Sequence, residues 1–199
     1  MRENLITKTA QWAMEVVSHY VAEGDTVVDG TMGNGHDTAA LARLVGPEGR
    51  VLAFDVQEQA LRNTTELLKE EEVRLGLKTG ALQSRVRLIC DSNANLRSYI
   101  DGLKPSAVVF NLGYLPGGDK NVTTTADETL RAVTEALDAV KPGGLVAAVM
   151  YSGHEQGAAE KEALLAWARE LPPKEYHAAY VAMWNQKKNP PELLLVTKK

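Results

Sequence analysis

Polar side chains able to hold a ligand gather where apolar, strand-like segments of this sequence end. Asp29 ends one such segment and precedes a turn that contains Gly30, Gly33 and Gly35, and Asp55 ends the next segment. The bare N–H groups of a glycine-rich turn that opens a helix can approach a nucleotide-like ligand. A carboxylate at the end of the second strand can accept hydrogen bonds from ribose hydroxyls. The spacing therefore predicts a nucleoside-binding edge on a parallel sheet.

The elements that position these residues alternate between strand and helix. Five apolar segments are each followed by a helix-like run, and the tail reads as two strands joined by the polar loop NQKKNPP. This alternation predicts a doubly wound α/β sandwich with a seven-stranded, mostly parallel sheet and an antiparallel C-terminal hairpin. An amphipathic helix over Glu3–Tyr20 should pack beside the ligand cleft. Because no linker or repeat interrupts the pattern, we expect residues 1–199 to form one domain, with 1–24 as its N-terminal helical segment.

The glycine spacing narrows the class of ligand. It is G-x-x-G-x-G and not the G-x-G-x-x-G of dinucleotide binders, and with its acid it reads D-x-x-x-G-x-G. The segment DGTMGNGHDT resembles motif I of the class I S-adenosylmethionine-dependent methyltransferases. It is most similar to the rRNA-methylase family, whose characterised members methylate the aminomethyl group on the wobble uridine of certain tRNAs. The segment NLGYLPGGDK resembles the N-P-P-Y-like loop of amino-methylating enzymes, with Leu-Gly in place of Pro-Pro.

The resemblance covers nearly the whole chain, and it implies a Rossmann-like methyltransferase sandwich, S-adenosylmethionine as cofactor and the tRNA anticodon region as substrate. Asn111, Tyr114 and His154 are the implied catalytic residues. An Asn oxygen can accept amine hydrogens and aim the lone pair for in-line displacement, a Tyr can stack on the target base, and a His can hold substrate or accept the amine proton. The alternatives are a packing aromatic for Tyr114 and a helix cap for His154. The implied cofactor-binding residues are Asp29, Thr31, Gly33, Asn34, Gly35, His36, Asp37, Asp55, Gln57, Asp91, Ser92, Asn111 and Gly113.

Asn93 departs from the pattern of the family, which often carries histidine at this position, so its role stays open. The loop between the last two strands contains Trp184, Lys187 and Lys188. An aromatic side chain combined with positive charge is typical of RNA contacts, but it is equally typical of an ordinary solvated loop.

The composition of the chain restricts its possible partners and its cellular compartment. A net charge of −4 argues against an indiscriminate nucleic-acid binder, because such proteins need many cationic contacts to phosphate. The single cysteine, Cys90, excludes an internal disulfide and fits a reducing cytoplasm. Because Cys90 lies in an apolar segment, we expect a buried thiol.

No apolar run approaches the ~20 residues of a membrane span, and the four histidines lack metal-ligand spacing. Because the chain has few basic residues, one subunit offers only a small positively charged surface to a tRNA. We therefore also expect a homodimer.

Three functions compete for this sequence. The first is an amino-nitrogen methyltransferase acting on the tRNA wobble uridine, with an rRNA base or a small-molecule amine as the alternative acceptor. The second, an NAD-dependent oxidoreductase, is disfavoured by the glycine spacing and by the loop that starts at Asn111. The third is a non-enzymatic RNA-binding module with a methyltransferase-like fold. It is disfavoured because a site that had lost its catalytic activity would not need to keep the glycine loop, Asp55 and Asn111.

Overall fold

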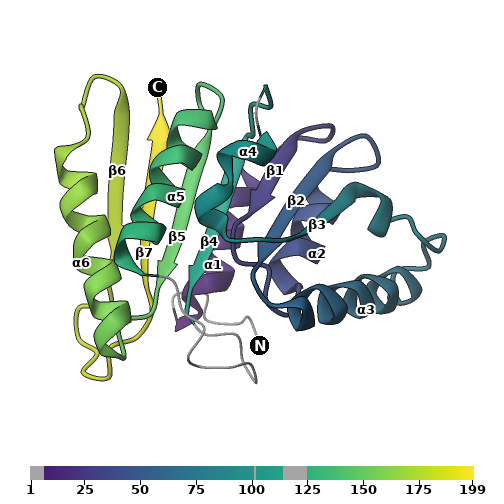
Figure 1. The fold of residues 1–199 in the computed structure, drawn as a ribbon, viewed down its shortest axis with the longest axis horizontal. Coiled ribbons are helices and arrows are strands. Elements are labelled where there is room, and N and C mark those ends of the chain that lie inside the picture. The colour runs from purple at the N-terminus through teal and green to yellow at the C-terminus, as the bar shows by residue number, and fades with distance from the viewer. Residues whose placement is uncertain (1–6, 101, 114–124) are drawn as a thin grey trace.

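One mixed sheet organises the protein (Figure 1). The computed structural model describes residues 7–100, 102–113 and 125–199. The strand order is β3-β2-β1-β4-β5-β7-β6, in which β1 to β5 run parallel and β7 lies antiparallel between β5 and β6. The predicted sheet of seven strands with an antiparallel C-terminal hairpin is thereby confirmed. The strands are β1 Thr26–Asp29, β2 Arg50–Asp55, β3 Val86–Cys90, β4 Ala107–Leu112, β5 Leu145–Met150, β6 Tyr176–Val181 and β7 Glu192–Lys198.

Helices cover both faces of the sheet, as the alternation of strand side chains requires. Val27 and its neighbours on one face pack against α1, α2 and α3, whereas Val28 and Phe110 on the other face pack against α4, α5 and α6. Two short 3₁₀ segments, Gln83–Arg85 and Asn93–Asn95, flank β3. The helices are α1 Thr9–Ser18, α2 His36–Leu44, α3 Glu58–Arg74, α4 Arg97–Ile100, α5 Ala126–Ala139 and α6 Glu155–Glu170.

The first helix and the cysteine differ from what the sequence predicts. The helix expected over Glu3–Tyr20 begins at Thr9 and ends at Ser18 within the described residues, and its first predicted positions lie outside them. The expected burial of Cys90 is wrong, because its side chain is exposed. Cys90 ends β3, one of the two edge strands of the sheet, which has β2 as its neighbour on one side and no strand on the other. Among the helices of the described residues, none combines the length and the apolar character that a membrane span requires.

The strand order fixes where a ligand can bind. The first half of the sheet proceeds outward from β1 through β2 to β3, and the second half proceeds the other way from β4. The loops that follow the carboxyl ends of β1 and β4 therefore leave the sheet in opposite directions. In open α/β sheets a ligand binds in the crevice at this switch point. Residues that follow β1, β2, β3, β4 and β5 all meet at this edge.

Candidate active site

A cleft of about 1520 Å³ opens at the carboxyl edge of the sheet. It is lined by the ends of all five parallel strands and by one side of α1 and α2. Most of the residues expected at the site lie on its wall, whereas Asp29 and Gly35 do not, and Tyr114 lies outside the described residues. The expected residues on the wall are Thr31, Gly33, Asn34, His36, Asp37, Asp55, Gln57, Asp91, Ser92, Asn111, Gly113 and His154.

The glycine loop is fastened between the strands on either side of it. The Gly30 N–H donates to Val109 O at 2.8 Å and the Met32 N–H donates to Phe54 O at 2.9 Å. Gly35 has φ +86°, and a Cβ there would come within 2.8 Å of the Thr64 side chain. A side chain at this position would therefore clash with α3 as well as strain the backbone. Gly35 shapes the loop and the start of α2 without lining the cleft.

Asp29 acts from beneath this loop. Its side chain is only 1% exposed, accepts the Thr38 hydroxyl at 2.6 Å and accepts the Thr31 N–H at 3.1 Å. Burial, aided by the negative charge of Asp37, raises the pKa of the Asp29 carboxyl to about 7. Hydrogen bonds from Thr38 and Thr31 oppose that rise but do not cancel it. Asp29 thus ties the glycine loop to α2 and does not line the cleft.

Asp55 holds the opposite side of the loop and also faces the cleft. Its two oxygens accept the Gly33 N–H at 3.1 Å and the Gln57 N–H at 2.9 Å. Burial raises the pKa of this carboxyl, against the effect of those backbone donors. Each carboxylate oxygen can accept more than one hydrogen bond. Asp55 therefore retains capacity for a pair of ligand hydroxyls while it fixes the loop.

Asn111 and Asp37 meet where β4 ends beside the start of α2. The Asn111 backbone N–H donates to Thr31 Oγ1 at 2.6 Å, and its side-chain Nδ2 donates to Asp37 Oδ2 at 2.8 Å. Asn111 Oδ1 is buried and has no hydrogen-bond partner within the described structure. Burial raises the pKa of the Asp37 carboxyl, although the bond from Asn111 acts against this. An orphaned amide oxygen next to a partly buried carboxylate is suited to bind a ligand that carries N–H donors.

His154 begins α6 as its N-cap. Its Nδ1 accepts the Gly157 N–H at 3.0 Å, and a Cβ on Gly157 would come within 2.8 Å of the imidazole ring. A neutral imidazole that accepts at Nδ1 carries its hydrogen on Nε2. In this arrangement the second ring nitrogen is a donor, which fits holding a substrate better than accepting an amine proton. The helix cap, which the sequence leaves as an alternative, is present.

The loop after β3 contributes two kinds of polar group. Asp91 accepts the Tyr99 hydroxyl at 2.8 Å, Asn95 Nδ2 at 2.9 Å and the Ser92 N–H at 2.7 Å, and these bonds, led by that from Tyr99, lower its pKa. Asn93 is 6% exposed and donates through Nδ2 to Gly30 O at 2.9 Å. Its Oδ1 has no partner in the described structure. Asn93 therefore offers the cleft a second orphaned acceptor.

Other residues on the wall were not expected from the sequence as ligand contacts. Tyr151 follows β5 and lines the cleft. Burial raises the pKa of its phenol, and the negative charge of Asp37 adds to this rise. Its position at a strand end was the available signal. Asn189, Gln11 and Met14 reach the wall from the β6–β7 loop and from α1, and no local pattern marks them. Across the described ranges, no group of three or more His, Cys, Asp or Glu side chains is arranged to hold a metal ion.

The sheet order, the glycine loop and the cleft at the switch point together define a class I methyltransferase fold. A crystal structure from Clostridium thermocellum, described as a putative rRNA-methylase, superposes with a TM-score of 0.86 at 38% identity, covering 96% of this chain and 97% of that one. A putative methyltransferase from Streptococcus mutans, solved in complex with SAH, gives a TM-score of 0.79 at 32% identity, covering 96% and 97%.

Sequence comparison gives the family. Residues 51–197 match the family described as "Putative rRNA methylase", and the chain belongs to it. A curated relative from Arabidopsis thaliana, the chloroplastic tRNA (mnm(5)s(2)U34)-methyltransferase, is 37% identical over 191 residues, in an alignment that covers 90% of this chain. The chain spans 65% of the length of that relative.

Proposed function

We propose that this protein is an S-adenosylmethionine-dependent N-methyltransferase that methylates the aminomethyl group of the modified wobble uridine in tRNA, converting 5-aminomethyl-(2-thio)uridine to 5-methylaminomethyl-(2-thio)uridine. Family membership and the name of the curated relative support this reaction. The observation that carries this proposal is the arrangement of Asn111 and Asp37. The Nδ2 of Asn111 donates to Asp37, whereas the Oδ1 of the same side chain is buried without a hydrogen-bond partner in the described structure. An amine that accepts the methyl group would supply an N–H donor to Asn111 Oδ1.

The residues of the cleft fit the proposed cofactor. Asp55 offers carboxylate oxygens to the ribose hydroxyls, and the orphaned Asn93 Oδ1 can accept an N–H of the ligand. Asp37 adds negative charge to a cleft that would receive a cationic sulfonium. When bound, the cofactor supplies an electrophilic methyl group. The glycine loop lets backbone approach the ligand where a side chain would not fit.

The side chains around Asn111 prepare the acceptor nitrogen. An aminomethyl group is an ammonium at neutral pH and must lose one proton before its lone pair can form a bond to carbon. Asp37 is the carboxylate bonded to Asn111 and accepts that proton, and burial makes it a stronger base than an exposed Asp because its pKa is raised. Asn111 Oδ1 accepts a remaining amine N–H and so aims the lone pair. His154, which lines the cleft at the start of α6, is the residue to which we assign the holding of the base.

Methyl uptake from labelled cofactor tests the proposal. The protein is incubated with tRNA that carries 5-aminomethyl wobble uridine, with the same tRNA carrying unmodified uridine, with ribosomal RNA, and with small primary amines. We expect label only in the aminomethyl tRNA. Label in ribosomal RNA alone, or in small amines alone, would assign the enzyme to one of those acceptors. Calorimetry that detected binding of NAD but not of S-adenosylmethionine would reject the whole class.

A further inference from the structure

The β6–β7 loop, residues 182–191, lies at the mouth of the cleft although it is remote from it in sequence. Figure 1 shows the connection from β6 to β7 at the lower edge of the sheet, the edge toward which β5 points. Asn189 lines the cleft itself. The base of the loop is tied to α1, because the Thr9 hydroxyl donates to Pro191 O at 2.9 Å. A surface on this loop is therefore within reach of any large ligand that enters the cleft.

The loop presents an aromatic face and positive charge together. Trp184 is 99% exposed, the largest exposure among the large hydrophobic side chains of the described residues. Lys187 and Lys188 are exposed and form no ion pair with another residue in the described ranges. Residues 182–191 contain no Asp or Glu, in a chain whose net charge is −4. Covering this indole with a binding partner would remove apolar surface from water and so favour binding.

The backbone of the loop is shaped by specific residues. The Gln186 N–H donates to Met183 O, which sets Trp184 and Asn185 at the corner of a turn. Asn189 has φ +43°, the only positive φ at a non-glycine position among the described residues, and two prolines follow it. Proline fixes φ and so restricts the chain where it joins β7. A preshaped loop loses less conformational entropy on binding than a flexible one.

We propose that the β6–β7 loop is a contact surface for single-stranded RNA, in which Trp184 stacks on an unpaired base next to the nucleotide held in the cleft and Lys187 and Lys188 bind the flanking phosphates. This inference rests on the proposed function, which brings an unpaired anticodon nucleotide to the cleft. Stacking on an exposed aromatic combined with backbone charge is how proteins hold unpaired nucleotides. Anionic membrane could also attract Trp and Lys, but the cleft beside the loop favours a nucleotide polymer.

The test measures affinity for an anticodon stem-loop RNA that carries 5-aminomethyl wobble uridine, over a series of salt concentrations. We expect Trp184→Leu to weaken binding roughly tenfold and Trp184→Phe to weaken it far less, because phenylalanine still stacks. The double variant Lys187→Ala/Lys188→Ala should reduce the salt slope by about 1.4, because each phosphate that a lysine neutralises on a single strand adds ~0.7 to that slope. Tryptophan fluorescence should be quenched by RNA in the natural protein and not in Trp184→Leu.

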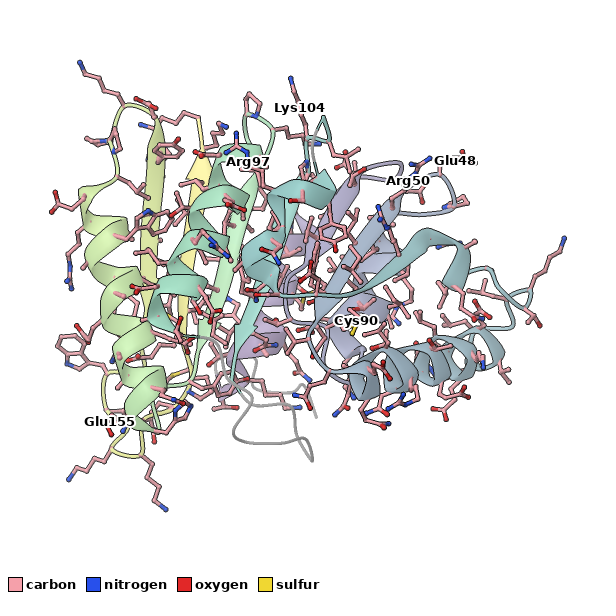
Figure 2. The ribbon with its side chains drawn as sticks, in the orientation of Figure 1. Glu48, Arg50, Cys90, Arg97, Lys104 and Glu155 are labelled. Carbon is pink, nitrogen blue, oxygen red and sulfur yellow. The ribbon has the colours of Figure 1, made fainter. Side chains whose placement is uncertain are left out.

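A matched control removes two charges elsewhere. Arg50 and Lys104 are exposed and lie at the upper edge of the molecule in Figure 2, away from the β6–β7 loop. The double variant Arg50→Ala/Lys104→Ala should keep both the affinity and the salt slope. Calorimetry with S-adenosylmethionine should give the same dissociation constant for the natural protein and for every variant.

Four outcomes would overturn the inference. If Trp184→Leu and the double lysine variant bind the stem-loop as the natural protein does, while that protein still methylates it, the loop does not touch RNA and the proposed function stands. If the natural protein neither binds nor methylates the RNA, both proposals fail together. Equal loss of binding in the Arg50/Lys104 control, or loop-dependent binding to vesicles of anionic phospholipid with none to RNA, would also reject the loop as an RNA surface.

Discussion

At the scale of single residues, Asn111 is held by two hydrogen bonds, while its side-chain oxygen has no partner among the described residues. Its backbone N–H is held by Thr31 and its Nδ2 by Asp37, so Oδ1 is presented in a defined direction. We expect Asn111→Ala to lower turnover about 100-fold, as positioning residues do, and to change the affinity for cofactor only slightly. Single-turnover kinetics together with calorimetry separates the two effects. Weak cofactor binding with normal turnover at saturation would assign Asn111 to the cofactor instead.

Asp37 should give the reaction a dependence on pH. Because burial raises its pKa, the carboxylate form is lost as pH falls through a value above that of an ordinary Asp. The rate should therefore fall on the acid side in the natural enzyme. Asp37→Asn should lower turnover about 100-fold and remove that part of the pH profile. An unchanged profile in Asp37→Asn would show that another group takes the proton.

Asp29 should make folding stability depend on pH. Its folded-state pKa of about 7 lies above the ordinary value of 3.8, so between these values the folded state holds a proton that the unfolded state has released. The stabilisation is complete below 3.8 and is lost as pH rises through about 7. Asp29→Asn should flatten this dependence, since Asn cannot ionise, and denaturant titrations from about pH 4 to about pH 8 measure it. A natural protein whose unfolding free energy rises over the same interval would contradict this assignment.

At the scale of elements, the start of α6 combines a cap with a cleft residue. His154 Nδ1 caps the Gly157 N–H, so His154→Ala should lower the free energy of unfolding by about 1 kcal/mol. Asn also caps well, so His154→Asn should recover most of that stability. Thermal unfolding and turnover are measured on both variants. If His154→Asn is stable and active, the cap is the main role, whereas a stable but inactive variant indicates that the imidazole touches the acceptor.

Element types followed from local pattern, whereas the contacts between elements did not. The glycine turn and Asp55 could be placed because a strand, a tight turn and a helix leave a signature within a short segment. The Asn111–Asp37 bond joins residues 74 positions apart, and it exists because β4 lies beside β1 in the sheet. Asp29 was expected at the cofactor, yet it is buried under the loop, since a sequence does not reveal on which side of a turn a strand-end carboxylate lies.

At the scale of the whole molecule, the sheet order gathers the site from nearly the full length of the chain. Gln11 of α1 and Asn189 of the β6–β7 loop reach the same cleft, and no local periodicity marks either one. The exposure of Cys90 could likewise not be predicted from its local segment alone. An apolar segment predicts a strand, but only the order of strands tells that β3 is at the edge and exposes its thiol. The roles assigned to the individual site residues, the single domain and the homodimer remain predictions.

Mass spectrometry of tRNA nucleosides from cells that lack this gene decides most directly whether the enzyme forms the methylated wobble nucleoside. We expect 5-methylaminomethyl-(2-thio)uridine to disappear and 5-aminomethyl-(2-thio)uridine to accumulate. The natural gene should restore the methylated nucleoside, whereas the Asn111→Ala gene should not. Unchanged wobble nucleosides alongside a missing methyl group in ribosomal RNA would contradict the proposed reaction.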